Sequence, residues 1–196
     1  KSFPIKGTIA RSGSRPDDDA LRALLLSSAK DQAEHVMIVD LVRNDLGRVA
    51  VPGSVEVHSI FSELTLKTVR HLVSEVRATV SETHDLADLI GAIFPGGSIT
   101  GAPKIAAMRA LDHCEHFNRG FYCGSLGVIR GGSEATLSIL IRTAVLSVDG
   151  LTYGTGGGLV ADSSAEQEFA ETELKAAAIN AAIASARNPK KPVRSV

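Results

Sequence analysis

The second half of the chain alternates extended runs with tight turns, and this pattern constrains the fold most. Aliphatic and β-branched residues fill runs at positions 124–129, 136–148 and 151–155. The pairs Gly131-Gly132 and Asp149-Gly150 lie between these runs, and such pairs are typical of antiparallel hairpin turns. Because helical stretches lie before and after the hairpins, the sequence predicts an α+β fold and not a doubly wound parallel sheet.

Five stretches have the apolar spacing of helices. They cover residues 17–26, 30–47, 85–93, 103–112 and 166–186. Gly47 offers a stop for the second, Pro103 suits the first turn of the fourth, and Asp162 or Ser163 is a start signal for the last. Residues 49–66 hold short β-branched runs interrupted by Pro52-Gly53, whereas residues 68–80 read as a strand or the entry to a helix.

Composition is that of a globular protein. Of 196 residues, 44% are hydrophobic, so the chain can bury a core, and the formal net charge of −1 gives no field that attracts nucleic acid. No apolar run is long enough to cross a membrane, and the N-terminus lacks the apolar core of a signal peptide. Cys114 and Cys123 read as reduced thiols of a cytoplasmic protein.

We see no repeat, linker or low-complexity block. The sequence therefore predicts one domain over residues 1–187, followed by a polar tail at 188–196. Two glycine-rich loops fit no nucleotide motif. Residues 96–104 lack the Gly-Lys-Ser/Thr ending of a phosphate loop, and residues 154–159 lack the last glycine of a dinucleotide fingerprint.

Two pairs of carboxylates at i,i+3 spacing suggest a site with chemistry. They are Asp31/Glu34 and Glu168/Glu171, and each pair lies on one face of its helix. Four clustered acids repel unless a cation holds them together, so the pattern indicates a metal site beside the amine of Lys6. The alternative is a solvated acidic helix face and an ordinary turn lysine.

Four segments in order resemble the motifs of the chorismate-utilising enzymes. They are Pro4–Thr8, Ala33–Arg48, Phe94–Lys104 and Gly156–Ser163, the last followed by Glu168–Thr172. Four long motifs across nearly the whole chain are far more specific than one glycine loop. The resemblance implies two orthogonally packed, mostly antiparallel sheets flanked by helices.

Within this family, Lys6 resembles the lysine of the aminodeoxychorismate synthases, where anthranilate synthases usually carry alanine. Asp31 points the same way, whereas His35 points weakly back. The resemblance therefore implies amination of chorismate to 4-amino-4-deoxychorismate, a step towards para-aminobenzoate and folate. Anthranilate synthase component I is the alternative within the family.

The resemblance also implies a role for each site residue. Lys6 and His71 would be catalytic, with the amine of Lys6 forming a covalent adduct with chorismate. Asp31, Glu34, Glu168 and Glu171 would hold Mg²⁺, directly or through its waters. The substrate-binding residues would be Gly7, Thr8, Ser98, Tyr122, Arg142, Gly156, Gly158 and Lys175. A glutamine amidotransferase subunit or domain would supply the ammonia.

The Lys6 motif lies almost at the start of the chain, whereas family members place a large part of the catalytic domain before it. We therefore expect the chain to be the C-terminal portion of a longer enzyme, inactive in isolation and prone to self-association through strand edges. A different class of hypothesis follows from the same point, namely a non-catalytic fragment that keeps only part of the site.

Overall fold

The computed structural model describes residues 1–131, 134–161 and 163–187. Two compact units are distinguished by their contacts, Lys1–Arg109 and Ala110–Val196. Helices and antiparallel sheets occur in both, so the predicted α+β class is confirmed. The predicted tail at 188–196 and the start signal at Asp162 lie outside the described residues. The single domain and the orthogonal packing of two sheets stay predictions.

A three-stranded antiparallel sheet forms the centre of the first unit. Its strands are β1 (Ile5–Ala10), β2 (Glu56–Thr65) and β3 (Val69–Arg77), in the order β1-β3-β2. In β3 every second side chain is buried, namely Arg70, Leu72, Ser74 and Val76. The open choice between strand and helix at residues 68–80 is thus settled as a strand, because burial follows a period of two.

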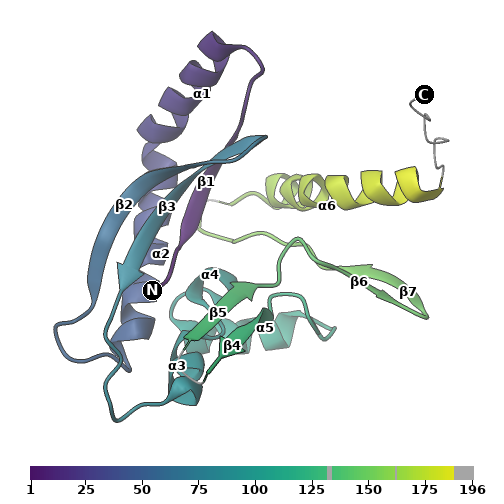
Figure 1. The fold of residues 1–196 in the computed structure, drawn as a ribbon. Helices are drawn as coiled ribbons and strands as arrows, with labels where there is room; N and C mark the ends of the chain where they lie inside the picture. Colours follow the sequence, from purple (N-terminus) through teal and green to yellow (C-terminus); the bar gives the residue numbers. More distant parts are fainter. Residues whose placement is uncertain (132–133, 162, 188–196) are drawn as a thin grey trace, which may run out of the picture. The chain divides into compact units, whose positions relative to one another are not determined.

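Two helices, α1 (Arg15–Ser27) and α2 (Ala29–Gly47), run along this sheet (Figure 1). The Ser28 hydroxyl caps α2 by accepting from the amide of Asp31. Val39 and Leu46 of α2 pack with Val76 of β3 in a buried cluster. Both predicted helices are confirmed to within two residues at each end.

Three shorter helices follow, α3 (Leu86–Ile93), α4 (Gly97–Thr100) and α5 (Lys104–Cys114). Asp85 and Asp88 form a reciprocal capping box at the start of α3. The four-residue α4 was not predicted. It packs against α2 at Gly97, where an added Cβ would lie 2.8 Å from a Leu41 methyl. This close approach requires a glycine.

The second unit contains two hairpins and a long helix. The hairpins pair β4 (Ser125–Arg130) with β5 (Glu134–Ile139) and β6 (Ala144–Ser147) with β7 (Gly150–Tyr153), and the helix is α6 (Ala165–Arg187). The hairpin signal at Asp149-Gly150 is confirmed, since Ser147 pairs with Gly150 across that turn. Residues 132–133 of the other turn lie outside the described residues.

The predicted single strand at 136–148 is wrong, because the structure divides it into β5 and β6. Leu140 exchanges backbone hydrogen bonds with Cys123 and Gly124, at 3.0 and 2.9 Å, and so extends the pairing of β5. Arg142 then adopts a φ of 54°, outside the range of regular strand backbone. The chain therefore turns before β6. Among the described residues, no helix is both long and apolar enough to span a membrane.

Candidate active site

Lys6 is presented by a β-bulge in β1. Lys6 pairs with Leu72 and Thr8 pairs with His71, so Gly7 is an extra residue between two positions of the register. Gly7 has a φ of 68°, and an added Cβ would lie 3.1 Å from Leu25 and 3.3 Å from Leu72. The position therefore needs glycine both for its backbone conformation and for space. The direction of the Lys6 side chain depends on this bulge.

The Lys6 ammonium lies beside the first acid pair. Its Nζ is 3.8 Å from Oε2 of Glu34, and both side chains are about one third exposed. On the other side of Glu34, Lys30 Nζ is 4.0 Å from Oε1. Asp31 lies one helical turn before Glu34 and is half-buried. The structure thus brings Lys6, Asp31 and Glu34 to neighbouring positions on β1 and α2.

His71 and Thr8 complete what we call the lysine cluster, which consists of Lys6, Gly7, Thr8, Asp31, Glu34 and His71. The Thr8 hydroxyl and His71 Nδ1 are 2.9 Å apart in an exposed position. This hydrogen bond fixes the imidazole orientation and leaves Nε2 available for a substrate proton. All six residues lie on β1, α2 and β3, so the pairing of β1 with β3 and the packing of α2 against both strands bring them together.

Beneath this cluster, His35 is fully buried. Its Nε2 is 2.6 Å from Oγ of Ser74, and its ring meets Phe61 edge-on at 5.5 Å. Its Nδ1 has no partner among the described residues. Burial, assisted by the charge of Lys6, lowers the pKa of His35 and keeps the ring neutral. His35 therefore joins α2 to β3 and does not face a substrate.

Ser98 lies exposed on α4 and has no side-chain hydrogen bond within the described residues. The same motif ends in Lys104, whose Nζ donates to the buried Asp45 carboxylate at 2.8 Å. The ion pair therefore joins the Phe94–Lys104 motif, at the start of α5, to the Ala33–Arg48 motif, near the end of α2. Sequence reasoning did not assign this role to Lys104.

The second unit carries a tyrosine cluster, which consists of Tyr122, Arg142, Gly156, Gly158, Glu168, Glu171 and Lys175. Its centre is the close contact of Tyr122 with the glycine-rich segment after β7. A Cβ on Gly154 would lie 2.3 Å from the ring, and one on Gly156 would lie 3.0 Å from the phenol oxygen. Glycine at these positions lets the Tyr122 ring lie directly on the backbone.

The second acid pair lies at the start of α6. Glu168 accepts from the Ser163 hydroxyl at 2.7 Å, and its carboxylate lies so close to Gly157 that a Cβ there would be 2.6 Å away. Glu171 pairs with Lys175 at 2.6 Å, and Lys175 Nζ also donates to the Gly156 carbonyl at 2.8 Å. Lys175 thus connects α6 to the glycine-rich segment.

Arg142 and Gly158 are the exposed binding candidates of the tyrosine cluster. The Arg142 guanidinium donates to the Lys175 carbonyl at 3.4 Å and is otherwise exposed, so it keeps donors for an anionic ligand. An added Cβ on Gly158 would meet no atom within 4 Å, so this residue borders open space. The arrangement around Tyr122, Arg142 and Lys175 can bind a carboxylate.

No group of three or more His, Cys, Asp or Glu side chains within the described ranges is placed to hold a metal ion. The two acid pairs belong to different units, Asp31/Glu34 to the first and Glu168/Glu171 to the second. The Mg²⁺ site stays a prediction.

One contact at the site was missed by sequence reasoning. Arg119 lies over the Tyr122 ring, with its Cζ 5.8 Å from the ring centroid, and is bound by Glu115. The available signal was the short spacing of these three residues. In a loop, where no periodic pattern supports it, the short spacing of Glu115, Arg119 and Tyr122 does not differ from a chance arrangement.

Residues 1–181 match the family of chorismate binding enzymes. The chain is 46% identical over 169 residues to aminodeoxychorismate synthase component 1 of Escherichia coli, covering 86% of this chain and 37% of that protein. It is 40% identical over 183 residues to anthranilate synthase component 1 of Saccharolobus solfataricus, covering 93% and 44%. The crystal structure of anthranilate synthase component I from Streptococcus pneumoniae matches with a TM-score of 0.77 at 35% identity, covering 89% and 41%. The chain therefore spans less than half the length of these relatives.

Proposed function

Because the chain belongs to the family of chorismate binding enzymes, we propose that it forms part of an aminodeoxychorismate synthase component 1. The reaction would join ammonia to chorismate and give 4-amino-4-deoxychorismate and water. The observation that carries the proposal is the lysine cluster. The Lys6 amine, on the bulged strand β1, lies 3.8 Å from the Glu34 carboxylate of α2. Lys6 is also the position at which the family resemblance implies a covalent catalyst.

In the first step the neutral Lys6 amine attacks C2 of chorismate, both ring double bonds shift by one position, and the C4 hydroxyl leaves as water after protonation. In the second step ammonia attacks C4, both ring double bonds shift back, and the C2–nitrogen bond to Lys6 breaks as the Lys6 nitrogen takes up a proton. A lysine amine attacks only when it is neutral, so a nearby group must accept its proton. Glu34 is placed to do so, and His71 is the candidate donor to the departing hydroxyl.

Tyr122 and Arg142 would bind the enolpyruvyl carboxylate of chorismate. Burial raises the pKa of Tyr122 to about 12, so its phenol is a hydrogen-bond donor at neutral pH. A guanidinium binds a carboxylate in a bidentate manner. Gly7, Thr8, Ser98, Gly156, Gly158 and Lys175 would contact the rest of the substrate.

The acid pairs suit Mg²⁺, because all four donors are carboxylates and hard cations prefer oxygen. The Glu168 carboxylate lies against the Gly157 backbone, where an added Cβ would be 2.6 Å from Oε2. When bound, Mg²⁺ would bind the ring carboxylate of chorismate and neutralise the acids. We also propose a glutamine amidotransferase partner as the source of ammonia, and a cytoplasmic location consistent with two unpaired cysteines.

Product analysis tests this proposal. Residues 1–181 replace the matched segment of the E. coli relative, and the chimera is incubated with chorismate, Mg²⁺ and ammonium. We expect 4-amino-4-deoxychorismate by chromatography, and none from the Lys6→Ala chimera. Fluorescent anthranilate as the product would instead establish the runner-up, which the 40% identity to an anthranilate synthase favours. Chorismate left unchanged by a folded chimera would contradict the proposal and support the non-catalytic hypothesis.

A further inference from the structure

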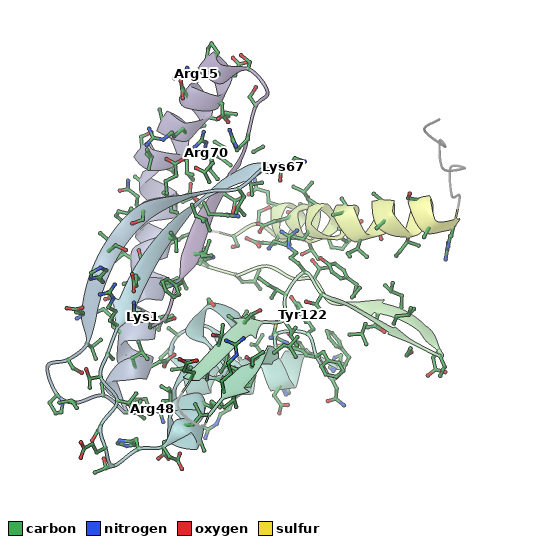
Figure 2. All side chains as sticks on the ribbon, in the orientation of Figure 1. Lys1, Arg15, Arg48, Lys67, Arg70 and Tyr122 are labelled. Atoms are coloured by element: carbon green, nitrogen blue, oxygen red, sulfur yellow. The ribbon has the colours of Figure 1, made fainter. Side chains whose placement is uncertain are left out.

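Arg119 and Tyr122 are the first and last residues of one tight turn between α5 and β4. The Tyr122 amide donates to the Arg119 carbonyl at 3.0 Å, and Gly120 within the turn has a φ of 58°. Cys123, directly after the turn, is tied to Leu140 by a 3.0 Å backbone hydrogen bond. The backbone therefore fixes where both side chains start. Tyr122 is labelled in Figure 2.

The guanidinium of Arg119 is itself fixed by Glu115. Its Nε and Nη2 donate to the two carboxylate oxygens at 2.7 and 2.6 Å, and both side chains are about one quarter exposed. Two parallel hydrogen bonds set the plane of a guanidinium as well as its position. Hydrogen bonding of Arg119 to the Glu115 carboxylate raises the pKa of Arg119, so the guanidinium stays charged. A charged plane at 5.8 Å from the Tyr122 centroid attracts the ring face.

Contacts with the glycine-rich segment define the rest of the Tyr122 position. The ring lies on the Gly154 backbone and its hydroxyl lies beside Gly156. The Gly156 carbonyl is already occupied by Lys175 Nζ at 2.8 Å. The phenol hydroxyl therefore lies at the glycine-rich segment, beside Gly156.

We propose that Arg119 is a positioning residue, which with Glu115 holds the Tyr122 phenol in the orientation that binds the carboxylate of the substrate. The role in substrate binding rests on the proposed function. A side chain held in its binding orientation loses little conformational freedom when the ligand arrives, so affinity rises without a new contact. Arg119 acts through Tyr122 and does not touch the substrate.

The chain offers a direct optical test, because it contains two tyrosines and no tryptophan. In a Tyr153→Phe background, Tyr122 alone produces the tyrosine band in near-ultraviolet circular dichroism. We expect Arg119→Gln to lose most of this band while the far-ultraviolet spectrum is unchanged, and Glu115→Gln to lose part of it. Arg43→Gln is the matched control, since Arg43 forms an ion pair with Asp40 at 2.8 Å and has no aromatic partner in the described part of the chain. A full Tyr122 band in folded Arg119→Gln and Glu115→Gln would overturn the proposal.

The kinetic test uses the chimera described above. Arg119→Gln should raise KM for chorismate about tenfold, the equivalent of one weakened charge-assisted hydrogen bond, with kcat nearly unchanged. A carboxylate held equally in ground and transition states affects KM and not kcat. An unchanged KM despite a lost Tyr122 band would overturn the role in substrate binding. An inactive chimera would count against the proposed function. The dichroism of residues 1–196 tests separately whether Arg119 fixes the orientation of Tyr122.

Discussion

Replacing Ser74 by alanine should strongly destabilise the first unit. The Ser74 hydroxyl is fully buried on β3, where it lies 2.6 Å from His35 Nε2 and accepts from the Phe61 amide at 3.2 Å. Alanine removes the hydroxyl and leaves both groups buried without a partner. Each unsatisfied buried group costs about 1–3 kcal/mol, so the free energy of unfolding should fall by roughly 2–6 kcal/mol.

A double-mutant cycle isolates the His35 contribution. His35→Leu removes the polar ring and leaves the hydrogen bond from Phe61 to Ser74 in place. When Ser74→Ala is combined with His35→Leu, only the Phe61 amide remains unpaired, so the loss should be smaller than the sum of the single losses by about 1–3 kcal/mol. This contact matters for the site because His35 adjoins Glu34 on α2, while β3 pairs with the strand that carries Lys6.

Urea unfolding followed by far-ultraviolet circular dichroism measures these losses. Amide hydrogen exchange of residues 69–77 then assigns the lost stability to the first unit. Tyrosine fluorescence would not do so, because both tyrosines lie in the second unit. Ser54→Ala is the matched control, since the Ser54 hydroxyl bonds to the Thr79 backbone in an exposed position. It should cost no more than about 1 kcal/mol. A Ser74→Ala protein as stable as this control, or strictly additive single changes, would refute the reasoning.

Two further predictions concern a buried charge network and the bulge. Hydrogen bonds from Arg70 and then Arg11 lower the pKa of Asp18 to about 2, and Figure 2 shows Arg70 beside α1. Since the pKa of an aspartate carboxyl in the unfolded chain is about 3.9, this stabilisation is complete above that pH and is lost as the pH falls to about 2. Asp18→Asn should therefore flatten the fall of the urea midpoint with acid, and an unchanged slope would exclude Asp18 as its source. Gly7→Ala should destabilise more than Gly53→Ala, because both have a positive φ but only Gly7 is packed against Leu25 and Leu72. Equal urea midpoints would show that backbone conformation alone requires Gly7.

Apolar spacing predicted the five longer helices, even though α5 and α6 contain no buried residue. It left β3 open because the buried face of that strand alternates Leu72 and Val76 with Arg70 and Ser74. Those two polar residues are stable inside because Asp18 and His35 contact them from the helices and Glu63 pairs with Arg70 from β2. No local sequence pattern predicts these pairs, because the partners lie far apart in the sequence.

The site was predicted unevenly for the same reason. The spacing of Asp31 and Glu34 gave a shared helix face, but only the pairing of β1 with β3 shows that Lys6 and His71 lie on adjoining strands beside that helix. The split between β5 and β6 depends on one residue, Arg142, whose positive φ leaves no signal in an aliphatic run. The roles proposed for the site residues come from the resemblance to the family motifs, because the geometry of one segment does not assign a role to a residue.

The most direct test of the central claim is the mass of the Lys6 peptide after reaction with chorismate. The active chimera is incubated with chorismate and Mg²⁺ without ammonium, quenched and digested. The account predicts a substrate adduct on the peptide that contains Lys6, its disappearance when ammonium is added, and no adduct in the Lys6→Ala protein. Turnover without any adduct on Lys6, or continued turnover by the alanine variant, would contradict covalent catalysis by this lysine.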